Sequence, residues 1–327
     1  MKVIVYGLGE MGKRMAERIL ASEALELVGA IDIDPEKVGK DVGELLGRSP
    51  VGVVVEKEAE KVLEEHPGAF VVHTTVSQLE KAAPQILQIL ETGHSGVSTT
   101  EELSYPWVRH PDLARKLDSV AKEKQRTFVG TGVNPGFLMD YFPAVVSALS
   151  SGIQAITVRR YVNASLRRKP LQAKIGSGLT PMEFKRLFDE GKMGHVGLVE
   201  SAQLLARLLQ WEIKDLKETC DPIVANETVE TQYFRVEPGF VRGMRHQVKA
   251  VDTRGRRIHL DLVMALDHPE QYDEVEIEGT PPVRVRFPEG VHGDMATVNV
   301  TLSVLRRVPD LPPGLLNMAD LPLPIPV

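Results

Sequence analysis

Two adjacent carboxylates, Glu101 and Glu102, follow three hydroxyl residues in the segment VSTTEELSYPW. Most carboxylates are solvated surface groups, so the pair can be no more than the polar end of a strand. A carboxylate beside a reacting group can instead move a proton or stabilise a positive charge. The elements that precede the pair decide between these two interpretations.

A glycine motif, GLGEMG, separates an apolar strand-like segment from a segment with helical spacing of apolar residues. In such a motif the first glycine permits a tight turn, the second lets the backbone approach a pyrophosphate, and the third lets the helix pack against its strand. The alternative is a tight turn without a ligand. In this strand–turn–helix context we predict a dinucleotide site, with cofactor contacts from Gly7, Leu8, Gly9, Met11 and Gly12.

Asp32 ends the second predicted strand, twenty residues after Gly12. This is close to the spacing of a carboxylate that binds the ribose hydroxyls of the cofactor. A 2′-phosphate would meet a like charge there, so we expect NAD rather than NADP. Lys13 and Lys37 can weaken this preference and allow NADP.

Strand-like and helix-like segments alternate through the first part of the chain. We predict strands at 2–6, 25–31, 51–55, 69–75, 95–100 and 127–131, and helices at 13–20, 57–65, 77–90 and 110–125, with Ser77 as a helix cap. Such alternation predicts the α/β class, with a doubly wound parallel Rossmann sheet over residues 1–135. Ligands then bind beyond the carboxyl ends of the strands.

Three predicted strands end in polar clusters, at residues 73–75, 98–102 and 130–134. One polar strand end is common in any protein. Three of them together with a dinucleotide motif are expected to lie at the nicotinamide half of the cofactor site. We therefore add Thr74, Thr75, Thr99 and Asn134 to the predicted cofactor contacts.

The pattern changes after residues 134–136, where strand-like segments become dominant. We expect strands at 155–162, 224–231, 243–251, 258–266 and 275–287, with helices at 140–150, 180–190 and 195–210. This predicts a second α+β domain of mostly antiparallel sheet, residues 136–291, for substrate binding and oligomerisation. A helix at about 292–308 is expected to pack on the first domain, and the Pro-rich residues 309–327 to be extended.

Composition excludes several classes of protein. A net charge of −6 argues against a nucleic-acid binder, and a single cysteine, Cys220, rules out a disulfide within the chain. No apolar stretch reaches the ~18 residues of a membrane span, and the first residues do not form a signal peptide. We expect a soluble cytoplasmic protein without a metal site, and a homodimer because an antiparallel sheet with an open face invites one.

Several segments together resemble one enzyme family. They are GLGEMG, STTEELSYPW, GTGVNPGFLMD, RRYVNASLRRKPLQAKIGSG and GHVGLVESAQLLARLLQW. They are similar to the 2,4-diaminopentanoate dehydrogenases and native amine dehydrogenases, within the dihydrodipicolinate-reductase-like superfamily. The paired histidines and the Pro-Ser-Gly-Thr stretch of true dihydrodipicolinate reductases are absent here, which argues against reduction of that cyclic imine.

The resemblance implies NAD(P)-dependent oxidative deamination of a short-chain amine to a ketone and ammonia, and the reverse reductive amination. In this family a carboxylate after the Thr-Thr turn stands beside the reacting amine. Glu101 matches that position, and Glu102 is the neighbouring candidate. Adjacent residues leaving a strand point in different directions, so we expect only one of them to face the substrate.

A diamino acid also needs partners for its carboxylate and second ammonium group. We expect Asn134, Tyr161 and Asn163 to contribute, and one of the two arginines at 159 and 160 to bind the carboxylate. Strand alternation places Arg160 on the face opposite to Tyr161. The alternative is that both arginines form salt bridges within the protein. His259 is a further candidate from a sheet strand.

Two other functions remain open from the sequence. The protein can be a reductase of another imine or carbonyl, in which the glutamates are structural. It can also be a nucleotide-sensing Rossmann protein without turnover. Cys220 fits a thiol nucleophile poorly, because its segment, ETCDP, is polar and holds no histidine.

Overall fold

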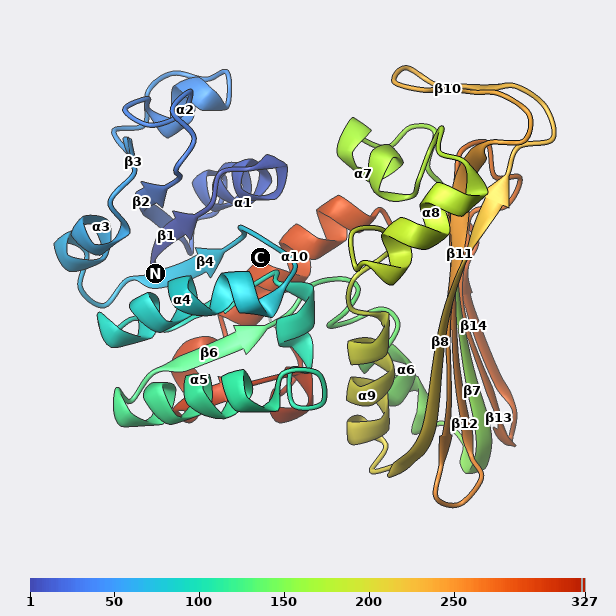
Figure 1. The fold of residues 1–327 in the computed structure, drawn as a ribbon. Helices are drawn as coiled ribbons and strands as arrows, with labels where there is room; N and C mark the ends of the chain where they lie inside the picture. The colour runs from blue at the N-terminus through green and yellow to red at the C-terminus, as the bar shows by residue number, and fades with distance from the viewer. Residues whose placement is uncertain (325, 327) are drawn as a thin grey trace. The chain divides into compact units, whose positions relative to one another are not determined.

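The computed structural model describes residues 1–324 and residue 326. The chain forms two compact units (Figure 1). The first unit comprises Met1–Phe137 and His292–Val327, and the second unit comprises Leu138–Val291. The first unit is therefore built from two segments, one that precedes the second unit in the sequence and one that follows it.

A seven-stranded parallel sheet forms the centre of the first unit, in the order β15-β6-β5-β4-β1-β2-β3. The strands are β1 (Lys2–Tyr6), β2 (Glu26–Ile31), β3 (Val55–Glu56), β4 (Phe70–His73), β5 (Gly96–Ser98), β6 (Thr127–Gly130) and β15 (Gly314–Leu316). The direction of winding reverses between β4 and β1, whose carboxyl ends form the switch point at which such sheets bind ligands. The parallel sheet confirms the predicted Rossmann fold.

The helices of the first unit bury apolar faces against this sheet. They are α1 (Glu10–Leu20), α2 (Val42–Leu45), α3 (Ala59–Glu65), α4 (Leu79–Glu91), α5 (Pro111–Glu123) and α10 (Gly293–Leu305), with 3-10 turns η1 (Glu101–Ser104), η2 (Val308–Asp310) and η3 (Met318–Asp320). On α4, Ile86 and Leu90 belong to the same fully buried core as Phe128 of β6. The predicted Ser77 cap is wrong: Gln78 precedes α4 without capping it, and the Glu102 carboxylate accepts the Leu79 N–H.

A six-stranded mixed sheet forms the second unit, in the order β14-β13-β7-β12-β11-β8. The strands are β7 (Ser151–Asn163), β8 (Ile213–Val224), β11 (Val241–Asp252), β12 (Arg257–Ala265), β13 (Tyr272–Thr280) and β14 (Val283–Phe287). Among these, β7 and β12 pair in parallel, and the other neighbours pair antiparallel. This confirms the predicted mostly antiparallel sheet. A separate hairpin joins β9 (Val229–Glu230) and β10 (Arg235–Val236).

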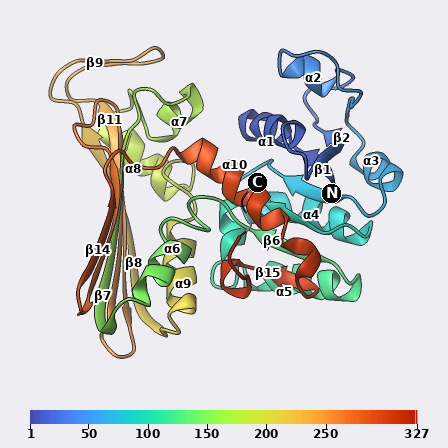
Figure 2. The same ribbon diagram turned by 180° about the vertical axis from the view of Figure 1, so that it is seen from behind.

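Helices cover one face of the six-stranded sheet (Figures 1 and 2). They are α6 (Tyr141–Ser147), α7 (Lys169–Lys174), α8 (Pro181–Asp189) and α9 (Leu198–Leu208). Ile156 and Val158 of β7 share a buried core with Leu205 of α9. The Ser201 hydroxyl donates to Asp140 Oδ2 at 2.8 Å, which joins α9 to the start of α6. Within the described residues, no helix covers the opposite face, which we call the helix-free face.

Two elements differ from the sequence prediction. The strand expected at 224–231 is wrong, because β8 occupies Ile213–Val224 and includes Pro222. Proline is tolerated there because β8 lies at the edge of its sheet. The tail contributes β15 to the first sheet, a strand too short to show a pattern in the sequence. Positions 325 and 327 of that tail lie outside the described residues. No helix in the part of the chain that is described is long and apolar enough to cross a membrane.

Candidate active site

The glycine motif forms a tight turn at the switch point, between β1 and α1. Gly7 has a φ of +96°, in the left-handed region that favours glycine. A Cβ on Gly12 would lie 1.8 Å from the Gly7 carbonyl oxygen, so no larger residue fits. That same oxygen accepts the Thr74 hydroxyl at 2.6 Å, which ties the turn to the end of β4.

The motif leaves room for a phosphate group at its second glycine. A Cβ on Gly9 would have no neighbour within 4 Å. Gly9 also precedes α1, whose first N–H groups lack partners within the helix and attract anions. Leu8 is fully buried and its backbone N–H donates to Asp32, whereas Met11 is half-buried on α1, so the Met11 backbone amide is the better suited of the two to this role. These features fit the pyrophosphate of a dinucleotide.

Asp32 lies directly beside the glycine turn. Its Oδ2 accepts the Leu8 N–H at 2.6 Å, and its Oδ1 accepts the Asp34 N–H at 2.9 Å. Lys37 bridges the two carboxylates, with its Nζ 3.2 Å from Asp32 and 3.2 Å from Asp34. Burial lowers the pKa of Lys37, but the bonds to Asp34 and Asp32 outweigh it and the net shift is upward. A carboxylate and a charged ammonium group therefore lie together at the position where the sequence predicts ribose binding.

The three polar strand ends come together in the structure, as the sequence predicts. The strands that carry them, β4, β5 and β6, are neighbours in the sheet. The Thr99 N–H donates to the His73 carbonyl, and the Thr131 N–H donates to the Ser98 carbonyl. The Thr75 hydroxyl donates to Gln85 Oε1 at 2.7 Å.

The remaining predicted contacts at these strand ends are half-buried. Thr99 follows β5, and Asn134 lies in the loop after β6, where it precedes Pro135. Their roles as cofactor contacts stay predictions, like those of Thr74 and Thr75.

The two glutamates have different surroundings, although they are adjacent in η1. Glu102 Oε2 accepts the Leu79 N–H at 2.7 Å and the His110 Nε2–H at 2.9 Å, and only 12% of the side chain is exposed. This carboxylate therefore holds the start of α4 and the residue before α5. Glu101 begins η1 at the strand end itself and is half-buried. The bonds of Glu102 to these two helix starts disfavour it as the catalytic carboxylate, and the role of Glu101 stays a prediction.

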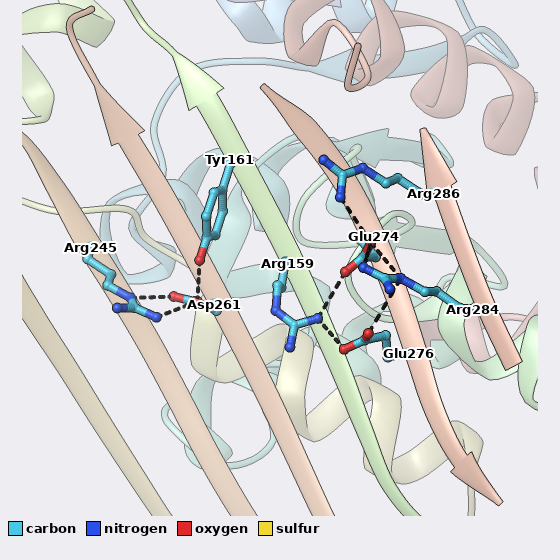
Figure 3. Close-up of polar contacts among 8 residues, drawn as sticks. All are labelled: Arg159, Tyr161, Arg245, Asp261, Glu274, Glu276, Arg284 and Arg286. Carbon is cyan, nitrogen blue, oxygen red and sulfur yellow. Dashed lines mark hydrogen bonds and ion pairs between the residues drawn. The ribbon is translucent and has the colours of Figure 1, made fainter. Parts of the chain in front are cut away.

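Two of the predicted substrate contacts belong to ion-paired clusters on the helix-free face (Figure 3). Tyr161 donates its hydroxyl to Asp261 Oδ2 at 3.0 Å, and Asp261 also accepts two bonds from Arg245. Burial and the nearby Asp261 carboxylate raise the pKa of Tyr161 to about 12. Arg159 is paired with both Glu274 and Glu276.

The other predicted contacts of the second unit are also engaged. Asn163 donates to the His268 carbonyl and accepts the Ser165 N–H, so its amide shapes the end of β7. His259 Nε2 lies 3.1 Å from Gln247 Nε2, and burial is the main cause of its lowered pKa.

Arg160 is buried on the helix-covered face, where it pairs with Asp273 at 2.8 Å and donates to the Val291 carbonyl at 2.9 Å. For both arginines, the geometry agrees with the alternative interpretation, ion pairs within the protein, and disfavours a substrate carboxylate on Arg160. Arg160 and Tyr161 do lie on opposite faces of the sheet, as strand alternation predicts. Within the described residues, no cluster of histidine, cysteine, aspartate or glutamate could hold a metal ion.

Matches to known proteins cover nearly all of the chain. Residues 137–327 match the 2,4-diaminopentanoate dehydrogenase C-terminal domain, and residues 1–101 match the dihydrodipicolinate reductase N-terminus. The 2,4-diaminopentanoate dehydrogenase of Acetoanaerobium sticklandii is 30% identical over 99% of this chain and 94% of its own length. The amine dehydrogenase of Streptomyces virginiae is 25% identical, over 98% of this chain and 96% of its own length.

A solved structure agrees with these matches. The structure of amine dehydrogenase from Mycobacterium smegmatis superposes with a TM-score of 0.88 at 26% identity, and the match covers 99% of this chain and 96% of that one. The family match extends over more than half of the chain, and a relative at 30% identity spans nearly all of it. The chain therefore belongs to the 2,4-diaminopentanoate dehydrogenase family.

Proposed function

We propose that this protein is a nicotinamide-dependent amine dehydrogenase, with 2,4-diaminopentanoate as its substrate. The observation that carries the proposal is the Glu101 turn, which stands among polar strand ends next to a glycine turn with room for a pyrophosphate. The names of the full-length relatives support the same activity. The match to dihydrodipicolinate reductase ends at residue 101, so it supports the nucleotide-binding part and not that enzyme's reaction.

The reaction converts a primary ammonium compound and water into a ketone and ammonium, with loss of a hydride and a proton. A bound oxidised nicotinamide supplies the hydride acceptor. Glu101 first takes a proton from the substrate ammonium, which frees the nitrogen lone pair. After this proton has passed to solvent, the Glu101 carboxylate stabilises the cationic iminium carbon–nitrogen bond electrostatically. It then accepts a proton from the water that adds to carbon and returns that proton to the nitrogen, and the nitrogen leaves as ammonia, which takes up the hydroxyl proton to form ammonium as the ketone forms.

Substitution of the two glutamates tests this assignment. In Glu101→Gln we expect kcat to fall by about 10²- to 10⁴-fold, the usual worth of a general base, with cofactor affinity and thermal stability retained. In the matched variant Glu102→Gln we expect a lower melting temperature and a much smaller loss of kcat, because its carboxylate binds Leu79 and His110.

Absorbance at the NADH band, with 2,4-diaminopentanoate as substrate, measures the rate. If the wild type is inert with this diamine but oxidises NADH in the presence of a simple ketone and ammonia, the proposed substrate is wrong and the proposed amine dehydrogenase reaction holds. A wild type inert toward all amines and ketones would contradict the function. If only Glu102→Gln loses kcat, the two glutamates exchange roles.

We further propose that NAD is preferred over NADP, because the Asp32 carboxylate repels a 2′-phosphate. Lys37, which bridges Asp32 and Asp34, reduces that repulsion. Asp32→Asn keeps the size of the side chain and removes its charge, so the ratio of kcat/KM for NADP to that for NAD should rise at least about tenfold. An unchanged ratio would show that Asp32 does not face the ribose.

We also propose that two copies of the chain pair through their helix-free faces. Asp261 and Glu274 are only 1% and 2% exposed there, because Arg245 and Arg284, which pair with them, cover them. A dyad can place the same open sheet face of a second copy against this one. Sedimentation should show a dimer for the wild type and a monomer for Thr157→Arg, on β7 in the middle of the sheet. A wild-type monomer at all concentrations would contradict the proposal.

A further inference from the structure

His73, the last residue of β4, is a fully buried histidine that no step of the proposed mechanism uses. Its Nδ1 lies 2.8 Å from Ser98 Oγ, and its Nε2 lies 2.8 Å from Gln85 Oε1 and 2.9 Å from Thr75 Oγ1. Its ring therefore joins three elements: β4, the end of β5, and α4.

The protonation of this ring follows from its partners. Gln85 Oε1 can only accept a hydrogen bond, so Nε2 carries the ring proton and Nδ1 is left as an acceptor beside the Ser98 hydroxyl, whose oxygen also lies 3.0 Å from Thr100 Oγ1. Burial lowers the pKa of His73 to about 4, against a smaller opposing influence of Gln85. The ring is thus neutral at ordinary pH, with each nitrogen in a fixed role.

The hydrogen bonds continue from Ser98 toward the catalytic turn. Ser98 Oγ accepts the Thr100 N–H at 3.0 Å, and Thr100 Oγ1 donates to the Val76 carbonyl at 2.8 Å. Thr100 is itself almost fully buried and directly precedes Glu101. The main-chain N–H of Thr99 also donates to the His73 carbonyl. Thr100 is therefore linked to the His73 ring through Ser98, and Thr99 is held by the main chain of the same residue.

We propose that His73 is a positioning residue that fixes the Glu101 turn through Ser98 and Thr100. The inference rests on the proposed function, in which Glu101 is the general base. Small displacements of such a group are costly, since an error of about 1 Å can reduce a rate about 100-fold. Gln85 and Thr75 complete the arrangement by holding the opposite edge of the ring.

Two substitutions separate the two edges of the ring. Asparagine places its amide near the Nδ1 position and can still bond Ser98, whereas glutamine reaches the Nε2 position and loses Ser98. His73→Gln should therefore lower kcat by about 10- to 100-fold, and His73→Asn should recover most of that loss. KM for the cofactor should change little in both, because the Thr74 bond to the glycine turn remains.

His94 provides a matched control in the same unit. It is also nearly fully buried and hydrogen-bonded through both nitrogens, to Thr92 Oγ1 and to the His66 carbonyl. However, it lies just before β5, at the amino ends of the parallel strands. His94→Gln should lower the melting temperature about as much as His73→Gln and leave kcat unchanged.

Hydrogen exchange of the Thr100 amide, which bonds Ser98 Oγ, gives a second readout that does not need turnover. Exchange there should be faster in His73→Gln than in the wild type, and unchanged in His94→Gln. Equal losses of kcat in the two glutamine variants, or unchanged exchange in His73→Gln, would overturn the proposal. If the wild type shows no amine oxidation, the proposed function fails, and the exchange measurement still decides whether His73 holds the turn.

Discussion

Replacing Arg160 by methionine should destabilise the second unit without weakening substrate binding. The guanidinium is 3% exposed, pairs with Asp273 at 2.8 Å and donates to the Val291 carbonyl at 2.9 Å. Asp273 Oδ2 in turn accepts the Val291 N–H at 2.6 Å. Removing one partner of such a pair leaves a buried, uncompensated charge, which costs about 3–5 kcal/mol of unfolding free energy. For a unit of this size the melting temperature should fall by about 6–20 °C.

The loss should depend on pH in a defined direction. Burial raises the pKa of Asp273, and the lowering influence of Arg160 is not enough to reverse this. A carboxyl group with a raised pKa in the folded state favours folding most at low pH, and this contribution is lost as the pH rises. Removing Arg160 raises that pKa further. The deficit of Arg160→Met should therefore shrink as the pH falls, because a protonated Asp273 carries no charge to leave unpaired.

Urea unfolding at several pH values, together with KM for the diamine, measures both effects. The double variant Arg160→Met with Asp273→Leu is the control, because it replaces the whole pair by apolar side chains. It should recover stability relative to the single variant and keep a deficit of about 1–3 kcal/mol from the Val291 N–H, which then has no carboxylate. A small loss of stability combined with a tenfold rise in KM would refute this reasoning and would place Arg160 on the substrate carboxylate.

Three further outcomes are expected. Tyr161→Phe should lose about 1–2 kcal/mol of unfolding free energy, from its bond to Asp261, with unchanged kcat and KM. Burial raises the pKa of Asp252, but hydrogen bonds from Arg256 and its neighbours lower this pKa by a larger amount, so the net shift is downward. The stabilising contribution of Asp252 should therefore be present near neutral pH and be lost as the pH falls. Urea midpoints of Asp252→Asn between pH 3 and 7 should accordingly vary less than those of the wild type. Burial, with the acidic neighbours of Cys220, raises the pKa of its thiol to about 12, so a disulfide reagent at pH 8 should react with this thiol only after the protein unfolds.

The turn formed by the glycine motif could be predicted from the sequence, because the need for glycine at each position arises from contacts within the turn itself. Gly7 needs a positive φ, and Gly12 has no room for a Cβ. The choice between Glu101 and Glu102 was not readable, because the partners of Glu102 come from the starts of two different helices. His73 was visible only as part of a polar strand end, since Gln85 and Ser98 reach it from other elements.

In the second unit too, features set by neighbouring residues could be predicted, and features set by residues far away in the sequence could not. Alternation along β7 correctly separated Arg160 from Tyr161, because the side-chain period of a strand is local. Which of the two faces the helices cover depends on α6 and α9, so it cannot be read from β7 alone, and the roles of Tyr161 and His259 as substrate contacts stay predictions. The carboxylates that pair with the two arginines lie on β13, more than a hundred residues away along the chain.

The position of β15 has a consequence for how the chain is made. Strand β6 gains its outer neighbour only when Gly314–Leu316 arrive, and Thr127 then also bonds the Pro312 carbonyl. On the ribosome, the whole second unit is therefore synthesised before β6 gains its neighbour on that side. A message cut short anywhere between would release a product with an unpaired edge strand, which is a template for aggregation. Truncation of translation anywhere within more than half of the chain length should thus yield a product prone to aggregation.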